Sequence, residues 1–296
     1  MTTFHTKLDH RGAIRVAGPD SRTFLQGLIS NDINRVTPDT AIHSAFLTAQ
    51  GKFLHEFFIC QQGDDLIFDC EAERAADLVK RLSMYKLRAK ASVEIAPELG
   101  VAAVFGDDPA GALGLAETPG ASRPCETGVA FMDPRLAVAG ARVLLPRESM
   151  KQTLDGLDLT PSDADTYDGH RIGLGLPDGS RDMIVDKAIL LENGFAELNG
   201  VDWDKGCFVG QELTARTKYR GLIKKRLLPV LIDGPTPPPG TPVLLEGKDA
   251  GEMRSAQKGR GLALLRLEKI AENPALEAAG AKLTLAVPDW VELPEA

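Results

Sequence analysis

The sequence predicts an α+β fold with a small β domain at its C-terminal end. Hairpin-like strands and helices occur in blocks, without the regular strand–helix–strand alternation of α/β proteins. From Leu227 onward, short apolar runs are separated by Pro and Gly, which is typical of a small closed or sandwich-like β structure. A chain of 296 residues, 43% of them hydrophobic, is long enough to form two structural units.

The N-terminal region predicts a strand, a turn and a helix in succession. Residues 13–16 have strand-forming side chains, and a Gly-Pro-Asp turn follows them. Asp20 or Ser21 then caps a helix that carries Leu25 and Leu28 on one face. Residues 41–70 break at Gln50-Gly51 and at residues 63–65, which predicts antiparallel strands joined by hairpin turns.

The middle of the chain alternates between periodic and irregular stretches. Residues 71–87 have the apolar spacing of an amphipathic helix, whereas residues 106–124 are rich in Gly, Ala and Pro and predict a surface loop or hinge. Strands return in residues 128–146, and residues 162–177 predict a helix that ends near Gly173 or Gly175. We therefore expect one region over residues 1–228, divided into two subdomains near 106–124, and a second over 229–296.

Composition and charge exclude several classes of protein. The formal net charge of −8 argues against general nucleic-acid binding, because that binding depends on neutralising phosphates. Two basic stretches, residues 80–90 and 216–226, are either solvated faces or local anion patches. The four cysteines and five histidines lack zinc-type spacing, so no metal site is predicted. Without an apolar leader or membrane span, we expect no membrane association and a cytoplasmic location.

The stretch KGCFVGQE, residues 205–212, is the strongest candidate for chemistry. Gly206 and Gly210 allow backbone conformations that other residues disfavour, so Cys207 is expected in a constrained turn before a short helix. A helix N-terminus and the ammonium of Lys205 would stabilise its thiolate. From spacing alone, a small buried hydrophobe is the commoner role of a lone cysteine.

Polar and aromatic side chains follow the cysteine on the expected helix. Arg216, Tyr219 and Arg220 could bind a flat ligand with an anionic tail, because guanidinium pairs with carboxylate and a tyrosine ring stacks. Gln211 and Glu212 would shape the turn or contact the same ligand, although a carboxylate in the first helical turn also favours the helix dipole.

These residues resemble a known family. KGCFVGQE with the trailing TARTKYRG is similar to the signature of the YgfZ-type folate-binding proteins, whose mitochondrial relatives act in iron–sulfur protein maturation. Further matches are GAIRVAGPDSRTFLQGLISND, FLTAQGKFLHEFF, YKLRAK, DPR at residues 133–135 and RIGLGLP at residues 171–177. The transferase of the glycine cleavage system has Phe-Ile-Gly, then Lys or Arg and Glu, where this chain has CFVGQE, which favours the YgfZ branch.

The resemblance implies an aminomethyltransferase-like fold, with α+β subdomains around a central folate pocket and a C-terminal β-barrel. It implies tetrahydrofolate or a one-carbon derivative as ligand, bound by Gln211, Glu212, Arg216, Tyr219 and Arg220. Iron–sulfur proteins or their assembly machinery would be the partners, with tRNA thiomethylation among the processes supported. Cys207 would then be the functional thiol and Lys205 its helper.

Two other functions remain open at this stage. A tetrahydrofolate-dependent aminomethyl or other one-carbon transferase would need an acid or base, for which Asp32 is the nearest candidate, although it is equally a turn residue. An RNA-binding factor could use residues 216–226. We expect an accessory factor more than a catalyst, and the sequence leaves enzymatic activity undecided.

Overall fold

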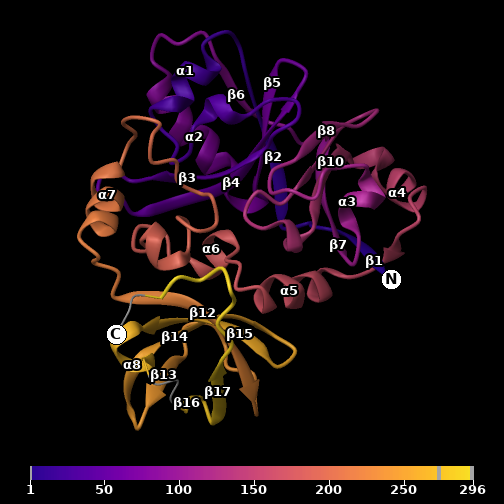
Figure 1. Ribbon diagram of the computed structural model, residues 1–296. Helices are drawn as coiled ribbons and strands as arrows, with labels where there is room; N and C mark the ends of the chain where they lie inside the picture. The colour runs from indigo at the N-terminus through magenta and orange to yellow at the C-terminus, as the bar shows by residue number, and fades with distance from the viewer. Residues whose placement is uncertain (1, 272–274, 294–296) are drawn as a thin grey trace. The chain divides into compact units, whose positions relative to one another are not determined.

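The computed structural model describes residues 2–271 and 275–293, which form two compact units. Unit 1 comprises Met1–Leu47, Leu54–Tyr167 and Leu198–Val209; unit 2 comprises Thr48–Phe53, Asp168–Glu197 and Gly210–Ala296. Figure 1 traces the chain from indigo at the N-terminus to yellow at the C-terminus. The predicted division into residues 1–228 and 229–296 stays a prediction.

Unit 1 contains a five-stranded sheet and two of the expected helices. Its strands are, in spatial order, β3 (Ile42–Leu47), β4 (Phe53–Gln62), β5 (Asp65–Glu71), β2 (Arg11–Ala17) and β6 (Ser92–Ile95). The helices are α1 (Ser21–Gln26) and α2 (Ala75–Lys86), with short 3₁₀ turns at Ile33–Arg35 and Ala72–Arg74. The predicted hairpins are confirmed, since Gly51 and Gly63 lie between consecutive strands with positive φ.

A six-stranded sheet completes unit 1. Its order is β11 (Thr160–Pro161), β1 (Thr3–Lys7), β7 (Leu99–Gly106), β10 (Ala141–Pro146), β9 (Val129–Met132) and β8 (Ser122–Pro124), with α3 (Pro109–Leu113), α4 (Arg147–Asp155) and a 3₁₀ turn at Ala137–Ala139. Along β7, Val101, Ala103 and Phe105 pack toward the first sheet, whereas Ala102 and Val104 pack toward α4. Burial on both faces explains why this strand is an unbroken apolar run.

The predicted loop over residues 106–124 differs from the structure. It contains α3 and the edge strand β8. The carboxylate of Asp108 accepts a hydrogen bond from the Gly111 N–H at 2.8 Å, and Pro109 occupies the first helical turn, where its missing N–H costs nothing. Local capping chemistry therefore outweighs the irregular composition.

Unit 2 contains a closed barrel, as the C-terminal pattern predicts. Its strands are, in order around the barrel, β12 (Lys225–Asp233), β15 (Arg260–Arg266), β14 (Lys248–Gln257), β13 (Pro242–Leu245), β16 (Leu276–Ala278) and β17 (Ala281–Leu285), with α8 (Leu267–Ile270).

The remaining helices are α5 (Ala164–Gly173), which leads into the unit, α6 (Gly179–Asp182), a 3₁₀ turn at Leu190–Asn193, and α7 (Gln211–Tyr219). The Asp182 carboxylate joins α5 to the barrel, because it pairs with Arg171 at 2.6 Å and accepts from the Ser255 N–H at 2.9 Å. The barrel interior is apolar, so the α+β fold with a separate β-barrel is confirmed.

Candidate functional site

The loop that carries the cysteine, residues 205–209, is fixed to the end of α1. The Lys205 ammonium donates to the carbonyls of Gln26 at 2.7 Å and Ile29 at 2.6 Å. The amide of Gln26 donates back to the Lys205 carbonyl at 3.2 Å, and the Val209 N–H donates to Gly27 O at 3.0 Å. Both ends of this loop, hereafter the motif loop, are therefore anchored.

The segment that precedes the motif loop is held in the same way. Ser30 Oγ donates to the Gly200 carbonyl at 2.6 Å, and the amide of Asn31 donates to the carbonyls of Asn199 at 2.8 Å and His43 at 2.7 Å. The bonds to Gly200 and Asn199 join positions 170 and 168 residues apart in sequence. Sequence periodicity carries no signal for such contacts.

The two glycines of the motif adopt the predicted backbone conformation. The φ angles are 87° at Gly206 and 81° at Gly210, a region that residues with a Cβ rarely adopt. At Gly206 a Cβ would meet no atom of the described part of the chain within 4 Å, so the requirement there is conformational and not one of space.

Cys207 is exposed on this anchored loop. Of the four cysteines, Cys60 and Cys70 are buried and Cys125 is half-buried. Burial raises the pKa of Cys60, Cys70 (to about 12) and Cys125. Cys207 is therefore the most accessible of the four thiols, and a buried structural role is excluded.

Brief treatment of the native protein with iodoacetamide should modify Cys207 first. Alkylation requires an accessible thiolate, which burial denies to Cys60 and Cys70. Peptide mass spectrometry against time would measure the four rates. Equal early modification of the buried cysteines would show that the core opens under native conditions.

Lys205 lies beside carboxylates, and its ammonium is directed to the carbonyls of Gln26, at the end of α1, and Ile29, just after it. Burial lowers the pKa of Lys205 to about 8, while Asp32 and Asp202 act in the opposite direction. The ammonium also lies 5.1 Å from the centre of the Phe208 ring. The contacts of Lys205 show that it anchors the motif loop. A direct effect on the Cys207 thiol stays a prediction.

Lys205 should therefore titrate near pH 8, with the ammonium present below that value and lost as the pH rises through it. Reductive ¹³C-methylation followed by NMR would show one lysine resonance with this midpoint. The resonance should be missing from Lys205→Arg. A spectrum in which the resonance absent from that variant titrates above about pH 10, the range of exposed lysines, would contradict the effect of burial.

Asp32 is close to Lys205 but has a local structural role. Its Oδ1 accepts hydrogen bonds from the backbone N–H of Asn34 at 2.9 Å and from the Asn34 amide at 3.0 Å. The residue caps the 3₁₀ turn Ile33–Arg35. The structure thus brings Asp32 and Lys205 together, while a role of Asp32 in proton transfer stays a prediction.

The predicted ligand-binding residues share one face of α7. Gln211, Glu212, Arg216, Tyr219 and Arg220 line a surface hollow of about 660 Å³. The Tyr219 side chain is 74% exposed. Two guanidinium groups and an exposed ring can recognise carboxylates and a flat group, but an open hollow covers less of a ligand than an enclosed pocket.

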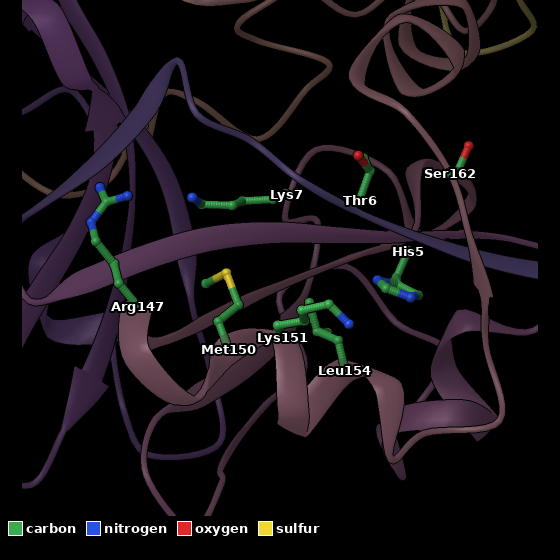
Figure 2. A pocket seen from close by; sticks show the side chains of 8 residues that line it. All are labelled: His5, Thr6, Lys7, Arg147, Met150, Lys151, Leu154 and Ser162. Carbon is green, nitrogen blue, oxygen red and sulfur yellow. The ribbon is translucent and has the colours of Figure 1, made fainter.

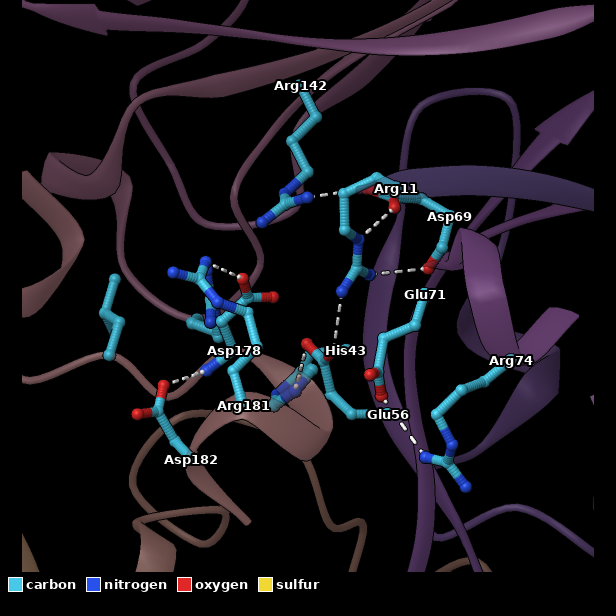
Figure 3. A network of polar contacts seen from close by, with 12 residues as sticks. Arg11, His43, Glu56, Asp69, Glu71, Arg74, Arg142, Asp178, Arg181 and Asp182 are labelled. Atoms are coloured by element: carbon cyan, nitrogen blue, oxygen red, sulfur yellow. Dashed lines mark hydrogen bonds and ion pairs between the residues drawn. The ribbon is translucent and has the colours of Figure 1, made fainter. Parts of the chain in front are cut away.

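A buried charge cluster in unit 1 was not found from the sequence (Figure 3). Arg11 contacts Asp69 at 2.6 Å and Glu56 at 3.0 Å, and Arg142 contacts Asp69 at 2.7 Å. Burial alone would raise the pKa of Glu56, but Arg11, followed by His43, holds it at about 2.

An aromatic ring and a second ion pair complete this charge cluster. The guanidinium groups of Arg142, Arg135 and Arg11 lie 4.1, 4.9 and 5.5 Å from the centre of the Phe58 ring. Arg135 pairs with Asp133 at 2.7 Å, so the DPR motif is a buried ion pair. The residues of the charge cluster come from five strands and a loop, which is why no local sequence pattern revealed the cluster.

Comparisons with known proteins show the family of this chain. Two proteins named iron–sulfur cluster assembly factor IBA57, mitochondrial, match 96% of the chain: the mouse protein at 36% identity and the human protein at 37%, each over 84% of its length. The chain belongs to the IBA57 family. The model of the CAF17 C-terminal β-barrel domain matches residues 224–293.

A solved structure agrees with the fold of this IBA57 family member. The glycine cleavage system aminomethyltransferase T from Bartonella henselae superposes with a TM-score of 0.79, over 98% of this chain and 86% of that one. At 15% identity, the likeness shows the fold alone. The aminomethyltransferase-like fold is thereby confirmed, whereas the narrower assignment to the YgfZ branch is not.

The predicted cytoplasmic location is wrong in the light of these relatives, which are named as mitochondrial proteins. That prediction rested on the lack of an apolar leader, and signals for an organelle need not be apolar. Within residues 2–271 and 275–293, no helix is long and apolar enough to cross a membrane. In the same residues, no group of three or more His, Cys, Asp or Glu side chains is arranged to hold a metal ion.

Proposed function

We propose that this protein acts in the assembly of iron–sulfur clusters on other proteins. The observation that carries the proposal is the exposed Cys207 on a motif loop anchored at both ends. The names of the IBA57 relatives support the same role.

The chemistry of clusters explains what one exposed thiol can contribute. Cluster iron is held by several thiolates, whereas this surface offers one cysteine on the motif loop. Cys207 would therefore donate one ligand to a cluster whose remaining ligands come from a partner in the assembly machinery. Anchoring by Lys205 would keep the thiol in a fixed position for that encounter.

Expression of this chain in cells that lack their own IBA57-family gene tests the proposal. We expect it to restore the activity of iron–sulfur enzymes, including radical enzymes that thiomethylate tRNA. An iron-free enzyme of the same compartment provides the control. No recovery of any iron–sulfur enzyme, with the protein present and folded, would refute the assembly role.

Tetrahydrofolate or a one-carbon derivative is the small ligand that we propose. The aminomethyltransferase-like fold supports it, and the α7 face supplies groups that match its chemistry. Arg216 and Arg220 would bind the glutamate carboxylates and Tyr219 would stack on a ring. When bound, the folate would carry a one-carbon unit.

Anaerobic calorimetry tests this ligand assignment. Tetrahydrofolate should bind the wild-type protein and bind Arg216→Gln/Arg220→Gln about tenfold more weakly, because two charge-assisted bonds are lost. Lys80→Gln/Arg88→Gln removes the same charge from exposed positions elsewhere and should match wild type. Unchanged affinity in the α7 variant would remove this face from the folate site, and no binding to wild type would remove folate.

A tetrahydrofolate-dependent transferase is the second candidate, favoured by the fold likeness to aminomethyltransferase T. It predicts turnover with an aminomethylated lipoyl carrier under anaerobic, reducing conditions. Asp32 would be its candidate acid or base, and Asp32→Asn should then lower the rate. Absence of turnover by the wild-type protein would exclude this activity.

A further inference from the structure

A separate pocket lies in unit 1, away from the motif loop in sequence (Figure 2). It has a volume of about 330 Å³ and is bounded by β1, α4 and the residue Ser162 that follows β11. That volume is at the lower end of the range of small-molecule pockets. None of the functions described above uses it.

The floor of the pocket is apolar and fixed by core packing. Met150 and Leu154 on α4 are each 3% exposed and belong to the core between α4 and the six-stranded sheet. A Cβ at Gly100 on β7 would lie 2.9 Å from Met150 Cε and 3.3 Å from Arg147 Cγ. The absence of a side chain at Gly100 thus leaves the space that these two lining residues occupy.

The rim of the pocket is cationic. Lys7, Arg147 and Lys151 line it, and none of the described residues that line it is a carboxylate (Figure 2). The nearby carboxylates pair at the surface: Asp9 with Lys7 at 2.9 Å and Asp155 with Lys151 at 2.5 Å. Exposed pairs of this kind contribute at most about 1 kcal/mol, so an anion in the pocket can compete for both lysines.

His5 supplies the observation that points to a ligand. It lines the pocket, is 9% exposed, and its backbone carbonyl is taken by the Ser162 N–H at 2.8 Å. Its Nε2 is buried without a hydrogen-bond partner among the described residues. Burial, opposed by Asp155, lowers the pKa of His5, so the ring is neutral at pH 7. A buried nitrogen without a partner is costly. Nε2 has almost no accessible surface, so the His5 ring would turn toward the pocket for a ligand group to satisfy it.

We propose that this pocket binds a small organic anion with an apolar body, in which a phosphate or carboxylate meets the lysines. The apolar body would lie on Met150 and Leu154, and a polar atom next to it would hydrogen-bond to His5. The required chemistry is that of an aryl or alkyl phosphate or carboxylate. The pocket is independent of the motif loop. If the pocket does not bind an anion, the proposed assembly role is therefore unaffected.

Titration of the whole protein with phenyl phosphate, benzoate and benzyl alcohol, followed by amide NMR at low salt, tests the site. Phenyl phosphate or benzoate should bind at millimolar concentration or below and shift amides of α4 and β1. Benzyl alcohol has the same aromatic ring but no charge, and it should bind about tenfold more weakly. The stronger of the two anions reveals whether phosphate or carboxylate is preferred.

Variants assign the binding to the rim. Lys7→Ala/Lys151→Ala removes exposed side chains and should weaken the anion about tenfold, whereas Lys80→Ala/Lys90→Ala, with the same loss of charge, should not. Histidine NMR should show the His5 Nε2 signal shifting with the anion. Wild-type affinity in the rim variant, or no binding of either anion at about 10 mM, would overturn the proposal.

Discussion

Replacing Arg11 by methionine should destabilise unit 1 by about 3–5 kcal/mol, or prevent folding altogether. Arg11 is 1% exposed and is paired with Asp69 and Glu56, which are also buried. Methionine fills a similar volume but leaves Glu56 without its nearest cation. Loss of one partner from a buried pair is costly because the other charge stays out of water.

Arg15 on the same strand provides the matched control. It pairs with Asp65 at 3.1 Å and Glu98 at 3.0 Å, but its side chain is 31% exposed. Arg15→Met should therefore cost about 1 kcal/mol or less, because water screens these pairs. Urea unfolding followed by circular dichroism would compare the two variants. Equal urea midpoints for the two variants would show that the buried cluster contributes no more to stability than a surface ion pair.

Much of the fold follows from local signals in the sequence. Gly51 and Gly63 interrupt alternating runs and mark the hairpins of the first sheet, and the apolar spacing of residues 71–87 predicts α2. Pro and Gly between short apolar runs predict the barrel strands. In each of these cases, neighbouring residues determine the conformation.

The features that were missed depend on distant residues or on a single side chain. Arg11, Glu56, Asp69 and Arg142 meet only after two sheets have packed, so no window of sequence contains their partners. The composition of residues 106–124 lacks periodicity and predicts a loop, although the Asp108 cap starts a helix there. Propensity describes a segment less well when one hydrogen bond decides its conformation.

The candidate site was predicted in part. The positive φ of Gly206 and Gly210 follows from residue type, and α7 begins at Gln211 as expected. The exposure of Cys207 did not follow, because a lone cysteine is more often buried. The bonds of Lys205 to the end of α1 could not be predicted either, since 176 and 179 residues separate the partners.

Cys207→Ser should abolish support of iron–sulfur enzymes while leaving the fold intact. Serine is close in size to cysteine, and the side chain at this position is exposed, so stability should change by no more than about 0.5 kcal/mol. The hydroxyl keeps its proton at pH 7 and cannot replace a thiolate as an iron ligand. The predicted loss of activity therefore comes from the missing thiolate and not from a loss of stability.

The central claim, that the anchored thiol performs the assembly role, is tested most directly in cells without their own family member. Wild type, Cys207→Ser and Cys125→Ser would be expressed at equal levels and the activity of an iron–sulfur enzyme measured. Cys125 is half-buried and outside the motif loop, so its variant is the matched control. Recovery with wild type and Cys125→Ser, but none with Cys207→Ser, is the predicted result. Full recovery with Cys207→Ser would contradict it.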